Sequence, residues 1–181
     1  MPMKAAQQSK QQLRANALAA RDALSEDARK AAAATIAARG LPFALQPGAV
    51  VAGYVAIRSE LDPAPLMLRL AAAGARLALP AITARGHALT FRAFAPDDRL
   101  VMGSLGIPEP SPAAAELIPN VMLVPLAAFD RAGHRIGYGG GYYPGGYGSG
   151  YSSGYQQGSG YQASSGGYQG TSLGIGFGLG R

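Results

Sequence analysis

The sequence predicts a single α/β domain with a mixed, mainly parallel sheet flanked by helices, and with a two-helix N-terminal segment. Helix-forming segments alternate with short apolar runs through residues 1–143, which is the pattern of strand–helix–strand units. Hydrophobic residues make up 48% of the 181 residues, enough for a sizeable core. Composition then changes sharply at Pro144, so we expect the α/β domain to span residues 1–143.

Three segments predict helices. Residues 5–23 are rich in Ala, Leu, Gln, Lys and Arg, which are good helix formers. Ser25 offers an N-cap hydroxyl followed by two acidic residues, and Gly40 is typical of the residue just past a helix end. A third helix is expected to open at Asp62, before a proline, and to close at Gly74.

Apolar runs predict the strands. Residues 49–57 (AVVAGYVAI) and 75–80 (ARLALP) are mostly apolar, as in buried strands. Residues 82–94 alternate around a glycine and predict an antiparallel hairpin, and residues 120–130 predict a strand that runs into a loop. In sheets of this class, ligands bind at loops that follow the carboxyl ends of parallel strands.

The C-terminal region has low complexity. Residues 145–170 contain only Gly, Ser, Tyr, Gln and one Ala, with no charge, so they cannot bury enough apolar surface to offset the entropy of ordering. We expect residues 144–170 to form a linker without regular structure, and residues 171–181 to supply a final strand. Such a tract fits weak self-association through tyrosines or a flexible spacer.

Composition narrows the functional classes. The absence of cysteine excludes disulfides, cysteine-ligated zinc and thiol catalysis. No 18-residue apolar run and no signal-peptide core are present, so we expect a cytoplasmic protein without a membrane partner. The net charge of +6 suits a polyanionic ligand such as a nucleotide, and equally nucleic acid or a solvated surface. We expect no nucleic-acid partner and a monomer.

A glycine-rich loop follows the strand near residue 125. Its glycines at 137 and 139–141 let the backbone approach a ligand, and successive N–H groups can form a nest for an anion. Arg135 adds a planar fork for phosphate oxygens, and the tyrosines could stack on a flat ring. The pattern lacks the Gly-Lys-Ser/Thr of a Walker A loop, and it also fits a glycine-rich turn without a ligand.

The segment VPLAAFDRAGHRIGYGGGYY, residues 124–143, closely resembles the signature of the 5-formyltetrahydrofolate cyclo-ligase family. Further motifs agree in order and spacing: KQQLR at 10–14, SELDPAPLM at 59–67, LALP at 77–80 and GIPEP at 106–110. The resemblance covers about residues 8–143 and the segment LGIGF near the C-terminus.

The resemblance implies ATP-dependent cyclisation of 5-formyltetrahydrofolate to 5,10-methenyltetrahydrofolate, with Mg²⁺ entering as Mg-ATP. In that family ATP is thought to phosphorylate the formyl oxygen, a second folate nitrogen attacks the activated carbon, and phosphate leaves. Such chemistry asks the protein mainly for positioning and charge neutralisation. The resemblance therefore predicts two adjoining sites, one for ATP and one for the reduced folate.

The matching positions give the expected site residues. The ATP-binding residues are Lys10, Arg14, Arg135, Gly137, Gly139, Gly140, Gly141 and Tyr143, with Arg135 also catalytic. The substrate-binding residues are Val55, Glu60, Tyr138, Gly139, Gly140, Gly141 and Tyr142. Because Lys10 and Arg14 are four apart on one helix face, we expect both to converge with Arg135 on one anion site. Val55 also fits a core position, and Tyr142 and Tyr143 also fit packing roles.

The sequence departs from the family at Pro144, where members usually carry an aspartate that binds magnesium. Proline has no side-chain oxygen for a hard cation, and no acidic residue follows Asp130 to supply the family's second acidic ligand. These departures predict slow turnover. The alternative is a catalytically inactive scaffold whose Tyr/Gly-rich segment mediates weak self-association or acts as a spacer.

Overall fold

The computed structural model describes residues 9–83, 87–129, 135–137 and 171–175, with residue 10 and the last range described by their backbone alone. The expected linker at 144–170 lies outside these residues. Within them, no helix is long and apolar enough to cross a membrane.

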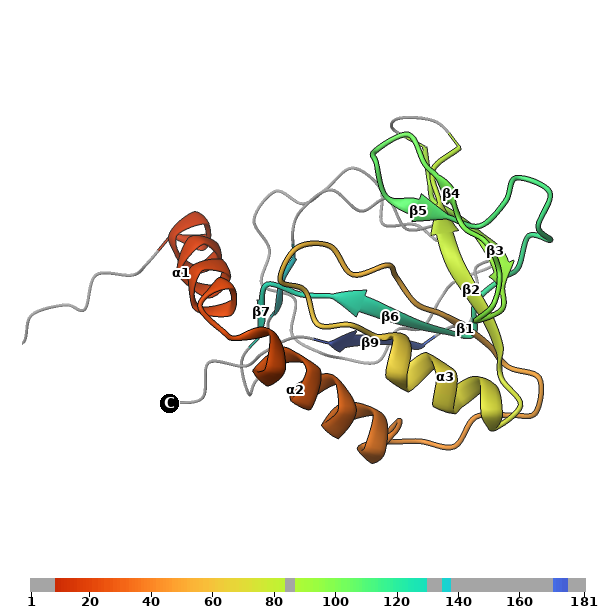
Figure 1. The fold of residues 1–181 in the computed structure, drawn as a ribbon, viewed down its shortest axis with the longest axis horizontal. Coiled ribbons are helices and arrows are strands. Elements are labelled where there is room, and N and C mark those ends of the chain that lie inside the picture. The colour runs from red at the N-terminus through yellow and green to blue at the C-terminus, as the bar shows by residue number, and fades with distance from the viewer. Residues whose placement is uncertain (1–8, 84–86, 130–134, 138–170, 176–181) are drawn as a thin grey trace, which may run out of the picture.

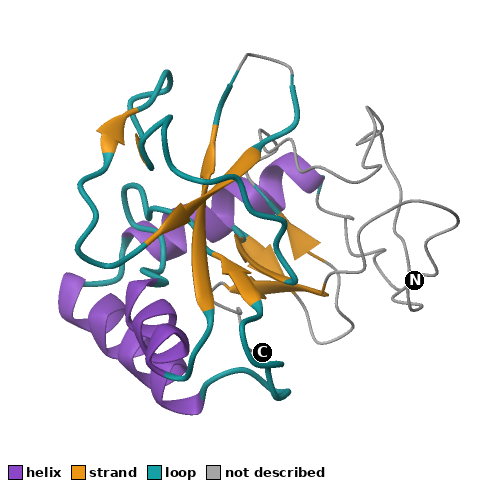
Figure 2. Ribbon diagram, turned by 90° about the vertical axis from the view of Figure 1, so that its right-hand side faces the viewer, coloured by secondary structure: helices purple, strands orange, loops and turns teal. Residues whose placement is uncertain are grey.

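Five strands form the central sheet in the order β3–β2–β1–β6–β9 (Figure 1). Strands β1 (Val50–Ala52), β2 (Arg76–Ala81), β6 (Val121–Pro125) and β9 (Thr171–Ile175) run parallel, and β3 (Thr90–Phe94) pairs antiparallel with β2 at one edge. Figure 2 shows the twist of these strands across one another. The predicted mixed, mainly parallel sheet is confirmed, and β9 lies within the segment expected to supply a final strand.

Helices α1 (Lys10–Asp22), α2 (Glu26–Arg39) and α3 (Ala64–Ala72) follow the predicted order. The Ser25 hydroxyl accepts a hydrogen bond from the Ala28 N–H at 3.1 Å, and Gly40 ends α2 with a positive φ of 74°. Both capping signals therefore act as the sequence predicts. Helices α2 and α3 pack together against the sheet, whereas α1 stands beside β7 at its edge (Figure 1).

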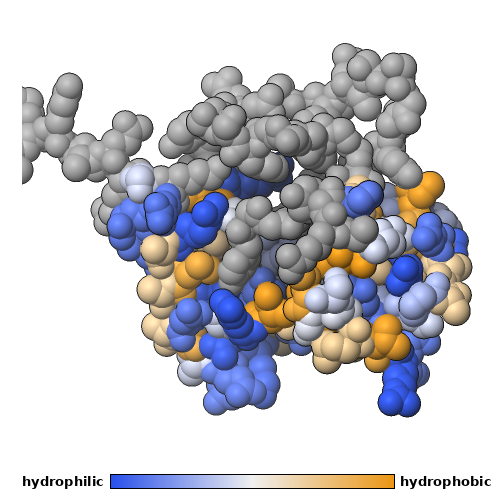
Figure 3. All heavy atoms as spheres, turned by 90° about the horizontal axis from the view of Figure 1, so that it is seen from above, coloured by the Kyte–Doolittle hydropathy of each residue, from blue (hydrophilic) through white to orange (hydrophobic). Residues whose placement is uncertain are grey.

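The main core lies between the sheet and the α2–α3 pair. Its buried side chains come from alternate strand positions such as Val51, Leu79 and Leu123, and from Leu66 and Met67 of α3. A smaller cluster on the opposite face joins Val50, Ala52, Ala78 and Phe91. The coloured part of the surface in Figure 3 mixes hydrophilic with hydrophobic residues, as is usual for the surface of a folded protein.

Two strand predictions need correction. The strand expected over 49–57 ends at Ala52, because beyond Gly53 the chain leaves the sheet and folds back on itself. Its apolar side chains still enter the core, which explains why composition alone suggested a longer strand. The hairpin expected within 82–94 instead joins β3 to the preceding β2, with Ala81 opposite Thr90.

Four two-residue strands complete the described elements. Strands β4 (Val101–Met102) and β5 (Pro108–Glu109) pair antiparallel, and β5 contacts β2 near the β3 edge of the sheet (Figure 1). Strands β7 (Ala128–Phe129) and β8 (Arg135–Ile136) pair antiparallel after β6. The second pair matters for the site, because it carries the start of the glycine-rich loop.

Candidate functional site

Two loops leave the carboxyl ends of neighbouring parallel strands. One follows β1 and contains Glu60, and the other follows β6 and leads through β7 and β8 to Gly137. Helix α1 lies at this end of the sheet and contacts β7 (Figure 1). This edge is where a sheet of this class binds ligands.

Arg14 joins α1 to the start of the glycine-rich loop. Its Nε–H donates a hydrogen bond to the Gly137 carbonyl oxygen at 3.0 Å, although the two residues are 123 positions apart. The Ala127 N–H donates to the Ile136 carbonyl at 2.7 Å, which fixes β8 against the chain leaving β6. The structure therefore brings Arg14 to the loop that the sequence assigned to phosphate binding.

Arg135 lies in β8, two residues before Gly137, and its side chain is exposed. An exposed guanidinium keeps its N–H donors accessible to a ligand. Lys10 is the first residue of α1, one turn before Arg14, but its side chain is outside the described set. The expected meeting of all three cations thus stays a prediction.

Glu60 sits in a tight turn after β1. Its backbone N–H donates to the Ile57 carbonyl at 3.1 Å, and its Oε2 accepts from the Ile57 N–H at 3.0 Å. The side chain is 8% exposed. Within this turn Arg58 has a φ of 54°, the left-handed region that residues other than glycine seldom occupy. The turn is therefore strained and held by its surroundings.

Burial raises the pKa of the Glu60 carboxyl, while the hydrogen bond from Ile57 and the positive charge of Arg21 oppose that rise. A carboxylate in this setting is held by few protein donors and shielded from water. Such a group gains from a ligand that brings N–H donors of its own.

The Glu60 turn is anchored on both sides. The Tyr54 hydroxyl donates to the Leu61 carbonyl at 2.7 Å, and both residues are buried. On the other side, Arg21 and Asp22 at the end of α1 bond to the Ser59 hydroxyl. Sequence reasoning missed these two α1 residues, since nothing in their spacing points to a turn nearly 40 positions away.

Val55 is partly buried and packs against the main core. This position fits either a core residue or part of the apolar wall of the site. Ile57 is half-buried in the same turn. The remaining predicted site residues lie outside the described residues: Tyr138, Gly139, Gly140, Gly141, Tyr142 and Tyr143. Pro144 lies outside them as well.

Metal binding receives no support from the described part of the chain. No group of three or more His, Asp or Glu side chains there is arranged to hold a metal ion. The residues that are described therefore do not fit a resident magnesium site.

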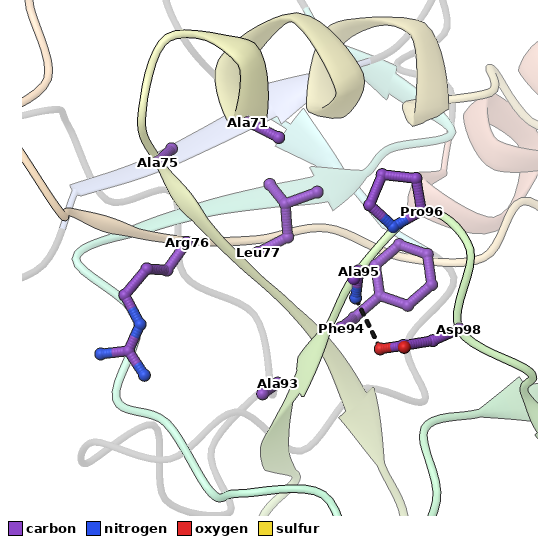
Figure 4. A pocket seen from close by; sticks show the side chains of 9 residues that line it. All are labelled: Ala71, Ala75, Arg76, Leu77, Ala93, Phe94, Ala95, Pro96 and Asp98. Carbon is purple, nitrogen blue, oxygen red and sulfur yellow. Dashed lines mark hydrogen bonds between the residues drawn. The ribbon is translucent and has the colours of Figure 1, made fainter.

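A cavity of about 330 Å³ lies elsewhere, between α3, β2 and the segment after β3. Ala71, Leu77 and Phe94 form its apolar walls (Figure 4). Arg76, the first residue of β2, also lines it, so the cavity opens at the amino end of that parallel strand. It is therefore separate from the Glu60 and Gly137 loops, which follow carboxyl ends.

Comparison with known proteins points to one family. A model described as the 5-formyltetrahydrofolate cyclo-ligase family matches residues 6–154. The 5-formyltetrahydrofolate cyclo-ligases of Escherichia coli strains K12 and O157:H7 are each 36% identical over 92 residues, covering 48% of this chain and 50% of theirs. The matched part thus spans about half the length of these curated relatives.

Two solved structures of 5,10-methenyltetrahydrofolate synthetases are also similar to this chain. The NMR structure of Aquifex aeolicus 5,10-methenyltetrahydrofolate synthetase is 30% identical with a TM-score of 0.60, covering 74% of this chain and 69% of that one. The Mycoplasma pneumoniae 5,10-methenyltetrahydrofolate synthetase is 19% identical with a TM-score of 0.52, covering 75% and 74%, and shows a shared fold alone.

Proposed function

This chain belongs to the 5-formyltetrahydrofolate cyclo-ligase family, as its motifs indicated, and we propose that it catalyses the ATP-dependent cyclisation of 5-formyltetrahydrofolate to 5,10-methenyltetrahydrofolate. The formyl oxygen takes the γ-phosphoryl group of ATP, releasing ADP. A second folate nitrogen then attacks the activated carbon, its N–H proton is lost, and phosphate leaves with the former formyl oxygen.

One observation carries this proposal. Helix α1 bonds to both loops at the carboxyl edge, through Arg14 to Gly137 and through Arg21 to Ser59 beside Glu60. The family resemblance assigns the first loop to ATP and the second to the folate. Phosphoryl transfer depends on holding the two reactants next to each other, and a single helix that contacts both loops would support such an arrangement.

On the folate side, Glu60 would accept hydrogen bonds from the amino and ring N–H groups of the pterin. Its carboxylate is buried and has one described backbone donor, so donors from the ligand would offset its desolvation. Val55 would form part of the apolar wall against the flat ring. Tyr138 and Tyr142, beyond the described residues, are proposed as further contacts.

On the nucleotide side, positive charge would neutralise the triphosphate. Arg14 donates its Nε–H to the Gly137 carbonyl oxygen. The terminal N–H groups of its guanidinium would donate to phosphate oxygens. Arg135 would approach the transferring group from β8, and Lys10 would add charge from the first turn of α1. Gly139, Gly140, Gly141 and Tyr143 complete the proposed cradle.

The described residues do not supply a site that would hold Mg²⁺. The described residues offer no acidic cluster, and Pro144 stands where the family resemblance expects a coordinating aspartate. Mg²⁺ would come with ATP, bound through phosphate oxygens. Because a loosely held reacting group lowers rate steeply, we propose that turnover is slow.

ATP and a reduced folate are the proposed partners, and we propose a monomer acting in the cytoplasm. A chain without cysteine is compatible with a reducing cytoplasm. The experiment is spectroscopic detection of 5,10-methenyltetrahydrofolate from 5-formyltetrahydrofolate, with and without ATP. Product that requires ATP supports the proposal, and Glu60→Gln should abolish or strongly reduce it.

A further inference from the structure

We propose that Arg21, acting with Asp22, is a positioning residue for folate binding: it holds Ser59 and thereby fixes the strained turn that presents Glu60. The proposal rests on the proposed function, because Glu60 is the residue assigned there to the pterin. Arg21 acts through its neighbours, and no contact between Arg21 and either substrate is implied.

Two of the described contacts meet at the Ser59 hydroxyl, beside the end of α1. Arg21 is 5% exposed, and its Nε–H donates to the Ser59 hydroxyl oxygen at 3.0 Å. The same hydroxyl donates its proton to Asp22 Oδ1. Ser59 itself is 7% exposed. The hydroxyl thus works as donor and acceptor at once, which fixes its direction and the backbone that carries it.

The held residue lies at a strained position in the chain. Ser59 is flanked by Arg58, in the left-handed region, and by Glu60, whose carboxylate turns back to the Ile57 N–H. A strained backbone persists only when surrounding contacts over-determine it, and such positions gather at binding sites. Helix α1 supplies those contacts from a part of the chain nearly 40 residues earlier.

The positive charge of the buried Arg21 also supports a positioning role. A buried guanidinium is unfavourable unless it is paired and hydrogen-bonded. Arg21 lies close enough to Glu60 for its positive charge to favour the ionised carboxylate, against the effect of burial. A methionine would fill much of the same space but would neither donate a hydrogen bond to Ser59 nor carry a positive charge. Arg21 is therefore better explained by what it does to the turn than by packing alone.

The test uses the full chain and three variants: Arg21→Met, Ser59→Ala and the double variant, with Arg39→Met as control. Arg39 is an exposed arginine in α2, outside the proposed sites. Dissociation constants are measured for 5-formyltetrahydrofolate and for ATP, and hydrogen exchange is followed at the Ile57 and Glu60 amides. Ser59→Ala keeps nearly the same volume, so it carries the test if Arg21→Met fails to fold.

Each single variant should weaken 5-formyltetrahydrofolate binding about tenfold or more, the effect of losing a hydrogen bond to a charged group. The double variant should weaken it by less than the product of the two, because both remove one interaction. ATP affinity should stay within about twofold, and the Ile57 and Glu60 amides should exchange faster than in Arg39→Met.

Two results overturn the inference alone: unchanged folate affinity in Arg21→Met and Ser59→Ala, or equal weakening of folate and ATP, which would indicate general destabilisation. A wild-type chain that does not bind 5-formyltetrahydrofolate overturns the proposed function and this inference with it. Hydrogen exchange at the Ile57 and Glu60 amides distinguishes the two failures, because it measures how firmly Arg21 and Ser59 fix the turn in the absence of any ligand.

Discussion

The two loops at the carboxyl edge of the sheet are built in different ways. In the Glu60 turn, Ser59 and Glu60 are buried and Arg58 has a strained backbone. The turn is held on one side by the hydrogen bond from Tyr54 to Leu61 and on the other by hydrogen bonds to α1. In the described start of the glycine-rich loop, residues 135–137, Arg135 is exposed and Arg14 donates a side-chain hydrogen bond to the Gly137 carbonyl. One loop offers a preset, desolvated acceptor, and the other offers accessible positive charge. Changes to the first should therefore alter stability as well as folate binding, and changes to the second mainly ATP binding.

The largest expected effect is on the open loop. Arg135→Ala should weaken ATP binding by about 1.5–3 kcal/mol, the range for hydrogen bonds to charged groups. The melting temperature should hardly change, because the side chain is exposed. Titration calorimetry with ATP and thermal melts of the wild type and Arg135→Ala check this, with Arg39→Ala as control. A lower melting temperature with unchanged ATP affinity would reverse the comparison.

The buried turn should show the opposite pattern. Tyr54→Phe removes the hydroxyl that donates to the buried Leu61 carbonyl, so the free energy of unfolding should fall by about 1–3 kcal/mol. Denaturant unfolding measures this, with the half-exposed Leu68→Ala as a surface control. ATP affinity should be retained. No loss of stability in Tyr54→Phe would mean that the turn is held without this bond.

A pH comparison sharpens the role of burial at Glu60. Its pKa is raised above 4.5 in the folded chain, so the folded state keeps the proton longer than the unfolded state. Wild-type stability relative to Glu60→Gln should therefore be greatest below pH 4.5 and fall as pH rises through the raised value. The glutamine can still accept from Ile57. Unfolding midpoints at pH 4 and pH 7 check the sign, and a relative gain in wild-type stability at pH 7 would contradict it.

The smallest expected difference between the two loops is in how salt concentration affects ligand binding. Exposed charges are screened by ions, so raising salt from about 0.05 to 0.5 M should weaken ATP binding by roughly several-fold. Folate binding at the buried Glu60 should change less. Parallel titrations at the two salt concentrations make the comparison. Equal salt dependence for both ligands would indicate that the two loops do not differ in the way the contacts suggest.

Local signals predicted much of the fold. Ser25 and Gly40 cap α2 as their chemistry requires, and apolar runs located β1, β2 and β6. The segment after Ala52 was misjudged because Tyr54 and Val55 bury their side chains from a loop, and burial alone does not distinguish a loop from a strand. The sequence pattern thus predicted which helices and strands form, whereas the length of β1 depended on tertiary packing.

For the site, the motifs predicted Glu60, Arg14 and Arg135, whose binding roles stay predictions, and the structure places Arg14 against Gly137. Arg21 was not predicted. Its partner Ser59 lies 38 positions away, and a contact over that distance leaves no trace in helical spacing or charge pattern. What the sequence could not show was how α1 connects the two loops, which depends on the folded arrangement.

The most direct test of the central claim is ring closure by the full chain held in excess over 5-formyltetrahydrofolate, with ATP and Mg²⁺ present. We expect 5,10-methenyltetrahydrofolate to form only with ATP, with one ADP for each product, and at a single-turnover rate about 10²-fold below that of the Escherichia coli cyclo-ligase assayed in the same way. Absence of any ATP-dependent product, or equal product without ATP, would contradict it.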